Sequence, residues 1–127
     1  MTADAPFGGD PAYPNPEQLL LAAAASCRLL SFLALAARAH VDVLEYADDA
    51  EAEMPVGRER MRITRIVLRP RVRVGDGTDR ALVTRLLHEA HEECYVARLA
   101  HHRGRDRAGG HVLMSVYGSV KWDSARA

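Results

Sequence analysis

The sequence has 127 residues, a length that typically forms one domain, so we expect a single domain over residues 1–127. Hydrophobic residues make up 48% and charged residues 27%, which is typical of a globular protein and excludes collagen-like, disordered and disulfide-scaffold chains. Seventeen basic and seventeen acidic side chains cancel. The overall charge therefore gives no reason to expect binding to nucleic acid or to an acidic membrane surface.

The first part of the chain bears on location. Its first 17 residues hold no lysine or arginine, so a secretory signal peptide is not expected. The most apolar stretch, residues 19–39, is interrupted by Ser26, Arg28, Ser31 and Arg38. Because an arginine inside a bilayer costs several kcal/mol, we do not expect this stretch to span a membrane. We expect a cytoplasmic protein, whose two cysteines are reactive or buried rather than a permanent structural bridge.

A long first helix is predicted after an irregular lead-in. Asn15 is a good N-cap, Pro16 suits the first helical position, and Glu17 complements the positive end of the helix dipole. The apolar pattern continues to about Ala39 and covers nearly the whole circumference, which predicts a central, buried helix. The small residues 22–26 would let another backbone approach closely.

A hairpin of opposite charges is predicted next. Residues 41–54 carry six acidic and no basic side chains, whereas residues 58–74 carry seven arginines and one acid. The second segment alternates in part between apolar and polar residues, and we expect its strand to break near Pro70. An acidic strand beside a basic one predicts an antiparallel pair with cross-strand ion pairs. These pairs account for the arginines without nucleic acid, for which aromatic stacking partners are missing.

The remaining sequence predicts a turn, a second helix and a last strand, over residues 75–78, 79–100 and 112–122. One face of the second helix collects apolar and cysteine residues at helical spacing: Leu82, Leu86, Ala90, Cys94 and Ala97. The element order is typical of the α+β class. Three strands are little cover for two apolar helices, so we expect a dimer or further strands.

The two cysteines fall on these two helices. Helix axes normally pack about 8–10 Å apart, whereas a disulfide needs Cα atoms within about 7 Å. The alanines around Cys27 would let its helix approach Cys94 closely enough. On spacing alone, however, two cysteines on apolar faces are more often inert core residues.

Three segments resemble one known family. Residues 15–27 read NPEQLLLAAAASC, residues 91–94 read HEEC, and residues 63–71 between them read ITRIVLRPR. In this order and spacing they are similar to the two cysteine motifs and a strand of the OsmC-like hydroperoxide reductases, over roughly residues 7–99. The resemblance implies an intertwined homodimer in which two long central helices pack against antiparallel sheet.

The resemblance also implies a reaction without a cofactor. Cys27 would attack a hydroperoxide and become a sulfenic acid, which Cys94 would resolve to a disulfide. An external dithiol, in relatives commonly a lipoylated protein, would then restore both thiols. Glu17 occupies the family's glutamate position, but ten residues are about 15 Å of helix and 80° of rotation. Glu17 would reach Cys27 only through a bent helix start or from a dimer partner.

One departure from the family concerns activation of Cys27. Relatives carry further N-terminal strands with an arginine that stabilises the reactive thiolate, and we expect this chain to lack them. A mid-helix cysteine gains little from the helix dipole, so another arginine is needed, and the candidates are Arg28, Arg58 and Arg60. Without one, the alternative is a non-catalytic binding domain or a redox sensor.

A metal site is the remaining alternative for the second helix. His88, His91 and Cys94 follow one another at steps of three residues, which would permit zinc binding together with Cys27 or Glu92. Histidines at the polar edge of an amphipathic helix are common, so we expect no metal.

Overall fold

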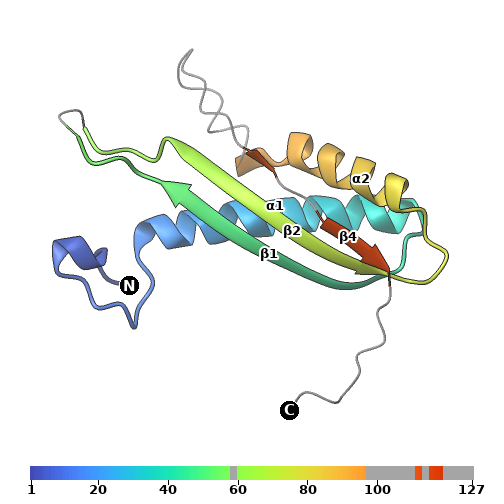
Figure 1. The fold of residues 1–127 in the computed structure, drawn as a ribbon, viewed down its shortest axis with the longest axis horizontal. Coiled ribbons are helices and arrows are strands. Elements are labelled where there is room, and N and C mark those ends of the chain that lie inside the picture. The colour runs from blue at the N-terminus through green and yellow to red at the C-terminus, as the bar shows by residue number, and fades with distance from the viewer. Residues whose placement is uncertain (58–59, 97–110, 113–114, 119–127) are drawn as a thin grey trace.

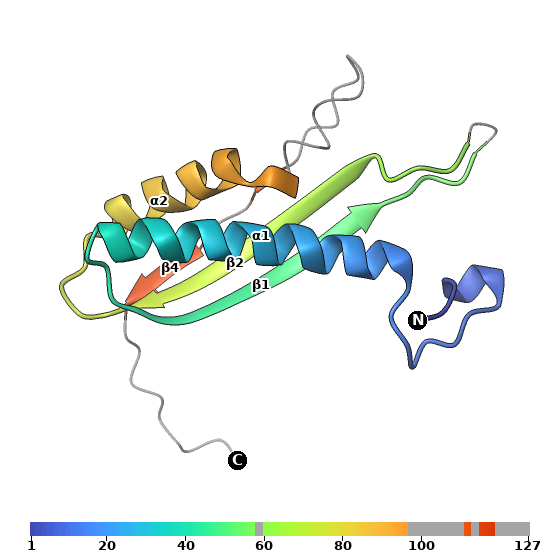
Figure 2. The same ribbon diagram turned by 180° about the vertical axis from the view of Figure 1, so that it is seen from behind.

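The computed structural model describes residues 1–57, 60–96, 111–112 and 115–118. In chain order its elements are η1 (Ala5–Phe7), α1 (Pro16–Arg38), β1 (Val43–Glu53), β2 (Arg65–Val74), α2 (Arg80–Glu93), β3 (His111–Val112) and β4 (Ser115–Gly118). The two helices lie beside each other on one face of the sheet (Figures 1 and 2). The predicted α+β architecture, with two helices against an antiparallel hairpin, is confirmed.

The start of α1 is fixed as the sequence predicts. Asn15 Oδ1 accepts a hydrogen bond of 2.8 Å from the Gln18 N–H, and Gln18 Oε1 accepts one of 3.0 Å from the Asn15 N–H. Pro16 occupies the first helical position. This reciprocal cap satisfies two main-chain donors that a helix start would otherwise leave without a partner. Asn15 Nδ2 also donates to Asp4 Oδ1 at 3.2 Å, which ties the N-terminal segment to α1.

The predicted hairpin and its charge pairs are confirmed. β1 and β2 pair antiparallel, with Glu45 opposite Arg73 and Glu53 opposite Arg65. Four ion pairs join the two strands: Arg65–Glu53 at 2.8 Å, Arg69–Glu51 at 2.8 Å, Arg71–Asp49 at 3.1 Å and Arg73–Glu45 at 3.0 Å. The alternate residues of β2, which include Leu68, Val72 and Val74, are buried. Because successive side chains of a strand point to opposite faces of the sheet, the ion pairs lie on the face that points away from the helices.

The predicted break at Pro70 is wrong. β2 runs without interruption through Pro70, which is buried and lies opposite Asp48 of β1. On its other side, β2 pairs with β3 at Val67 and Leu68 and with β4 from Arg71 onward. Pro70 lies between these two stretches, so its missing N–H interrupts neither of them.

The last strand adds to the sheet in a direction that the sequence did not predict. β3 and β4 both pair parallel to β2, so the described sheet is mixed rather than wholly antiparallel. The predicted strand over residues 112–122 is observed in part, as β3 and β4. The other residues of that range lie outside the described part of the chain.

The core lies between the helices and the inner face of the sheet. It consists of nine buried residues: Phe32, Leu35, Ala36, Val72, Val74, Val83, Leu86, Leu87 and Ala90. α2 ends at Glu93 rather than near residue 100, because Cys94 adopts an extended conformation with φ −65° and ψ 114°. Its N–H bonds back to the His91 carbonyl at 3.3 Å, which closes the last turn of the helix.

Only one face of α1 is buried in the single chain, in contrast to the predicted burial all round. Its buried residues are Ala24, Arg28, Phe32, Leu35 and Ala36. Exposed residues recur in alternating steps of four and three along another face, at Leu19, Ala23, Ser26, Leu30, Leu33 and Ala37. We call this set the α1 stripe; its spacing is that of a helix seam that packs on a second helix.

α1 also meets the length and composition criteria for a membrane span, which core helices of other proteins meet as well. Arg28 in its middle is fully buried and ion-paired with Asp48. An arginine of α1 that pairs with an aspartate of β1 is typical of a helix packed on the protein's own sheet. This agrees with the expectation that the stretch does not span a membrane.

Candidate functional site

The structure brings the two cysteines together. Cys27 lies in the middle of α1 and is partly exposed, whereas Cys94, the first residue beyond α2, is buried. Both are free thiols, and the Cys94 side chain lies near the Cys27 thiol. The sequence placed Cys94 inside a longer helix; its actual position at the helix end leaves its main chain free of the helical pattern. Two thiols that lie near each other can be joined by oxidation where their geometry permits a disulfide.

The surroundings of Cys27 favour its ionised form. Burial raises the pKa of the Cys27 thiol, but hydrogen bonds from the main chain at Val96, from the Cys94 side chain and from the main chain at Tyr95 lower it. The net effect is a pKa below the ordinary value of a cysteine. Because the thiolate is the nucleophile, these surroundings favour reaction at Cys27.

Arg28 forms its contacts with β1 and not with Cys27. It follows Cys27 directly, and one residue of an α-helix turns the side chain by about 100°. Its guanidinium is buried, forms an ion pair with Asp48 and lies 3.5 Å from the hydroxyl of Tyr46. Tyr46 donates to Asp48 Oδ2 at 3.2 Å and stacks at a tilt on Phe32, with ring centroids 5.9 Å apart.

This buried cluster also acts on Tyr46. Burial raises the pKa of Tyr46 to about 12, although the charge of Arg28 opposes the shift. Sequence reasoning missed Tyr46 and Asp48. The available signal was their spacing of two, which puts both on the same face of β1.

The other two candidate arginines are not brought to Cys27 by any described contact. Arg60 is exposed, in the connection between β1 and β2. Arg58 lies outside the described residues. The groups that hydrogen-bond to Cys27 belong instead to the segment that follows α2, and no pattern of side chains in the sequence could have singled out main-chain donors.

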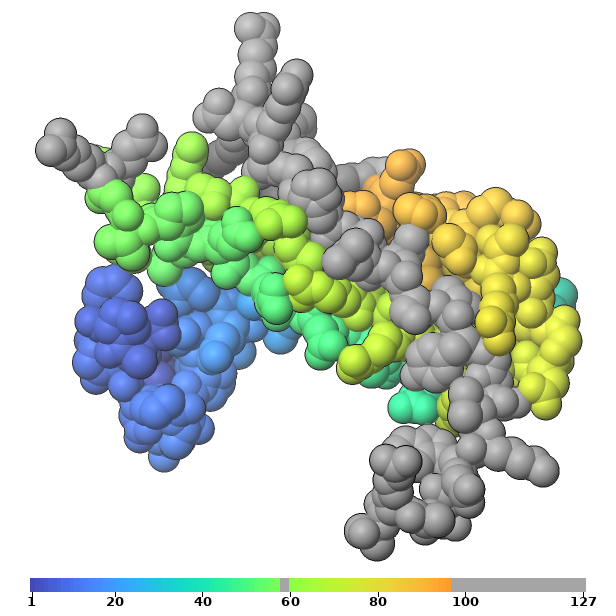
Figure 3. All heavy atoms as spheres, viewed as in Figure 1, coloured from blue at the N-terminus to red at the C-terminus, as the bar shows by residue number. Residues whose placement is uncertain are grey.

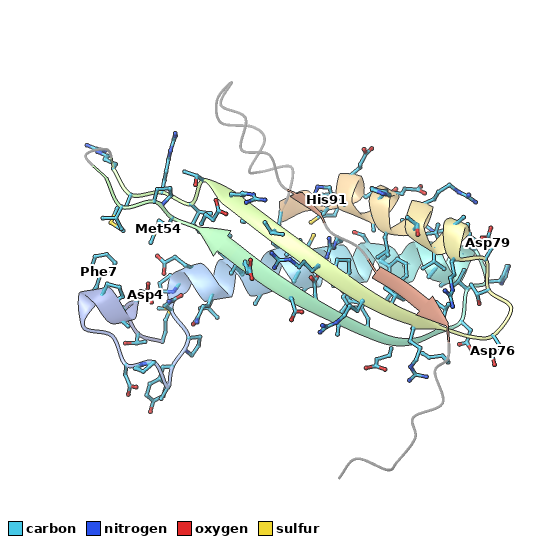
Figure 4. All side chains as sticks on the ribbon, in the orientation of Figure 1. Asp4, Phe7, Met54, Asp76, Asp79 and His91 are labelled. Atoms are coloured by element: carbon cyan, nitrogen blue, oxygen red, sulfur yellow. The ribbon has the colours of Figure 1, made fainter. Side chains whose placement is uncertain are left out.

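Glu17 is not brought to Cys27 within one chain. α1 is continuous from Pro16 to Arg38, so the two residues remain about 15 Å apart along its axis. Glu17 instead lines a cavity of about 460 Å³ between the N-terminal segment, the start of α1 and the outer end of the hairpin. The hollow is visible in Figure 3, and in Figure 4 Asp4 and Phe7 lie across it from Met54.

The cavity combines a mostly apolar wall with two carboxylates, those of Asp4 and Glu17. Its apolar side chains come from three segments and include Phe7, Leu21, Met54, Val56, Met61 and Ile63. Such a lining suits an apolar group rather than a strongly charged one.

The alternative of a metal site on α2 finds no support in the described residues. His88 is exposed and His91 is half-buried. Within the described part of the chain, no group of three or more histidine, cysteine, aspartate or glutamate side chains is placed to hold a metal ion.

Comparisons with known proteins identify the family of this chain. The family model described as OsmC-like protein matches residues 8–104. A comparison with curated proteins found no match.

Three solved structures share the fold. An OsmC-like protein of unknown function from Vibrio cholerae has 27% sequence identity and a TM-score of 0.67, over 86% of this chain and 68% of its own. An organic hydroperoxide resistance protein from Legionella pneumophila has 20% identity and a TM-score of 0.65, over 94% and 80% of the two chains. One from Elizabethkingia anophelis has 18% identity and a TM-score of 0.68, over 92% and 78%.

Proposed function

The chain belongs to the OsmC-like protein family, and from this premise we propose that it is a thiol-dependent peroxidase that reduces organic hydroperoxides. The observation that carries the proposal is the position of the Cys94 side chain near the Cys27 thiol, whose pKa lies below the ordinary value. A peroxidase of this kind needs a thiol with a lowered pKa beside a second thiol, and the lowered pKa of Cys27 with Cys94 nearby supports the proposal. Solved structures named for organic hydroperoxide resistance have the same fold.

The reaction follows from the chemistry of the two thiols. The Cys27 thiolate attacks one oxygen of the hydroperoxide, so an S–O bond forms, the O–O bond breaks, and the leaving alkoxide takes up a proton to become an alcohol. Cys27 is thereby oxidised to a sulfenic acid. The Cys94 thiol attacks this sulfur, and the hydroxyl group leaves as water with the thiol proton. A dithiol, such as a lipoylated protein, then restores both thiols and is itself oxidised to a disulfide.

We further propose that two copies of the chain pack through the α1 stripe. Leu30 is 67% exposed and Leu33 is 39% exposed in the single chain. Exposed leucines in a helical seam, separated by small residues such as Ala23 and Ser26, suit a second helix better than solvent. In such a dimer, Glu17 would act on the Cys27 thiol of the partner subunit, since it does not reach Cys27 of its own chain.

Peroxide consumption with a dithiol reductant tests the peroxidase. The wild-type protein should consume cumene hydroperoxide repeatedly in the presence of dihydrolipoamide, whereas Cys27→Ser should consume none. Cys94→Ser should form a sulfenic acid that dimedone traps and that no internal thiol resolves. Equal inactivity of the wild type and Cys27→Ser would overturn the proposal.

One observation favours a second candidate, a redox sensor or a non-catalytic binding domain of the same fold. Arg28, the arginine nearest to Cys27 in sequence, is committed to Asp48. A sensor would form the Cys27–Cys94 disulfide once with peroxide but would not turn over with the dithiol. A binding domain would form no peroxide-dependent disulfide at all.

A further inference from the structure

The outer end of the hairpin contributes two methionines to one cavity. Asp48 of β1 faces α1, where it pairs with Arg28. Side chains alternate along an extended chain, so Ala52 and Met54 continue this face of β1 to the end of the strand and beyond it. Met61 comes from the other arm of the hairpin, and it lines the same cavity of about 460 Å³ as Ala52 and Met54.

The opposite wall belongs to the N-terminal segment and to the start of α1. Phe7 and Leu21 line it, and Figure 4 shows Phe7 and Asp4 across the hollow from Met54. The hydrogen bond of 3.2 Å from Asn15 Nδ2 to Asp4 Oδ1 ties this segment to α1. The volume lies within the range of about 300–1,000 Å³ that is typical of small-molecule sites. An apolar molecule placed there would bury its surface against apolar side chains on both walls.

The two methionines bring a reactive atom to this wall. Among the residues that line the cavity, Met54 and Met61 are the ones that carry sulfur. A thioether is oxidised by peroxides to a sulfoxide. Because a thioether has no proton to lose, this reaction needs no neighbouring base or cation to activate the sulfur.

We propose that Met54 and Met61 form a modification site, in which apolar hydroperoxides bound in the cavity oxidise them to methionine sulfoxide. The thioether sulfur attacks the terminal oxygen of the hydroperoxide, so an S–O bond forms and the O–O bond breaks. The sulfur is oxidised by two electrons, and the leaving alkoxide takes up the hydroxyl proton and departs as an alcohol. No thiol takes part in this reaction, so the inference goes beyond the peroxidase and does not depend on it.

Binding in the cavity distinguishes this site from a methionine that is merely exposed. The Met61 side chain is 40% exposed, so exposure alone would make every peroxide oxidise it more slowly than a free thioether. An apolar hydroperoxide held in the cavity stays beside the sulfur, which raises the rate for that oxidant. Hydrogen peroxide has no apolar group to bury and gains no such advantage.

The experiment compares cumene hydroperoxide with hydrogen peroxide in a Cys27→Ser/Cys94→Ser chain, in which no thiol remains to consume the oxidant. Leu44→Met in the same background is the matched control, because Leu44 is 43% exposed and lies on β1 outside the cavity. Peptide mass spectrometry gives the oxidation rate of each methionine with each oxidant. The ratio of the rate with cumene hydroperoxide to the rate with hydrogen peroxide should be about tenfold higher at Met54 and Met61 than at position 44.

Filling the cavity should remove this excess. Ala52→Phe places a ring in the wall and should bring the ratio at Met61 down to that of position 44. If Ala52→Phe does not fold by circular dichroism, cumyl alcohol is added to the unfilled chain as a competitor with the same apolar group. It should slow the oxidation of Met61 by cumene hydroperoxide and leave position 44 unchanged.

Equal ratios at Met61 and at position 44 would overturn the inference. An excess at Met61 that neither the filled cavity nor the competitor reduces would overturn it as well, since binding in the cavity would not be its cause. The measurement is made without thiols, so a failure of the peroxidase proposal would be seen separately, in the consumption of peroxide by the wild-type protein.

Discussion

Arg28 and Asp48 form a buried ion pair that joins the middle of α1 to the centre of β1. Because Cys27 is the neighbour of Arg28 in α1, this pair also fixes the rotation of the helix about its axis. With Arg28 held toward the sheet, Cys27 is directed about 100° away, toward the end of α2. An ion pair on another face of α1 thus helps to determine where the Cys27 thiol lies.

Breaking this pair should destabilise the fold strongly. In Arg28→Met the carboxylate of Asp48 is left buried without its cation, and such a loss typically costs about 3–5 kcal/mol of the free energy of unfolding. The double variant Arg28→Met/Asp48→Leu should recover most of this loss. Three polar atoms of the pair, Arg28 Nε, Arg28 Nη1 and Asp48 Oδ1, already lack a hydrogen-bond partner among the described residues. Urea denaturation measures all three proteins.

The control for this prediction is an exposed pair of the hairpin. Arg71→Met removes the ion pair with Asp49, whose two side chains are 50% and 60% exposed, and should cost no more than about 1 kcal/mol. If Arg28→Met costs no more than this control, the buried pair does not have the structural role given to it above.

Tyr46 should make the folded state sensitive to alkaline pH. The pKa of Tyr46 is raised to about 12 in the folded protein, chiefly by burial, whereas an unfolded tyrosine titrates near 10. Between these values the unfolded chain binds fewer protons than the folded one, so the free energy of unfolding falls as pH rises. The contribution is fully present below pH about 10 and is lost as pH rises through about 12.

Two phenylalanine variants isolate this effect. Tyr46→Phe should weaken the fall of stability between neutral and alkaline pH, measured by urea denaturation at each pH. Tyr13→Phe, at a side chain that is 58% exposed, should leave the slope of the wild type unchanged. Equal slopes for Tyr46→Phe and Tyr13→Phe would contradict the assignment.

A charge in the α1 stripe should prevent dimer formation. Leu30→Glu places a carboxylate in the proposed seam, where it would be buried against the partner subunit at a large cost. We expect this variant to be a monomer by light scattering and the wild-type protein to be a dimer. Leu44→Glu makes the same substitution at a leucine of β1 that is 43% exposed, and it should leave the dimer intact. A wild-type monomer, or a Leu30→Glu dimer, would refute the seam.

Local rules account for what the sequence predicted well. The cap of α1 depends on Asn15 and its near neighbours, and the hairpin on the facing charges of two adjacent segments. Interactions over a few residues determine both features, so composition and spacing are enough to predict them. The sequence also indicated that Cys27 and Cys94 could lie close together, because both fall on apolar faces of the predicted helices.

Features that depend on tertiary contacts were not predictable in this way. The strand continues through Pro70 because of where β3 and β4 pair with β2, which no local pattern encodes. In the sequence Arg28 interrupts an apolar helix. Its partner Asp48 lies twenty residues away in the chain, so local spacing does not reveal the pair. The end of α2 at Glu93 runs against the helical spacing of its apolar residues, which continues past Cys94.

The position of Cys94 outside α2 has a mechanical consequence for the proposed redox cycle. A thiol carried inside a helix could move to meet another sulfur only by distorting that helix. The torsion angles of Cys94 are free of the helical ladder, so bond formation and cleavage at its sulfur can be accommodated by one residue. We therefore expect oxidation of the sulfur pair to leave the packing of Val83, Leu87 and Ala90 in the core unchanged.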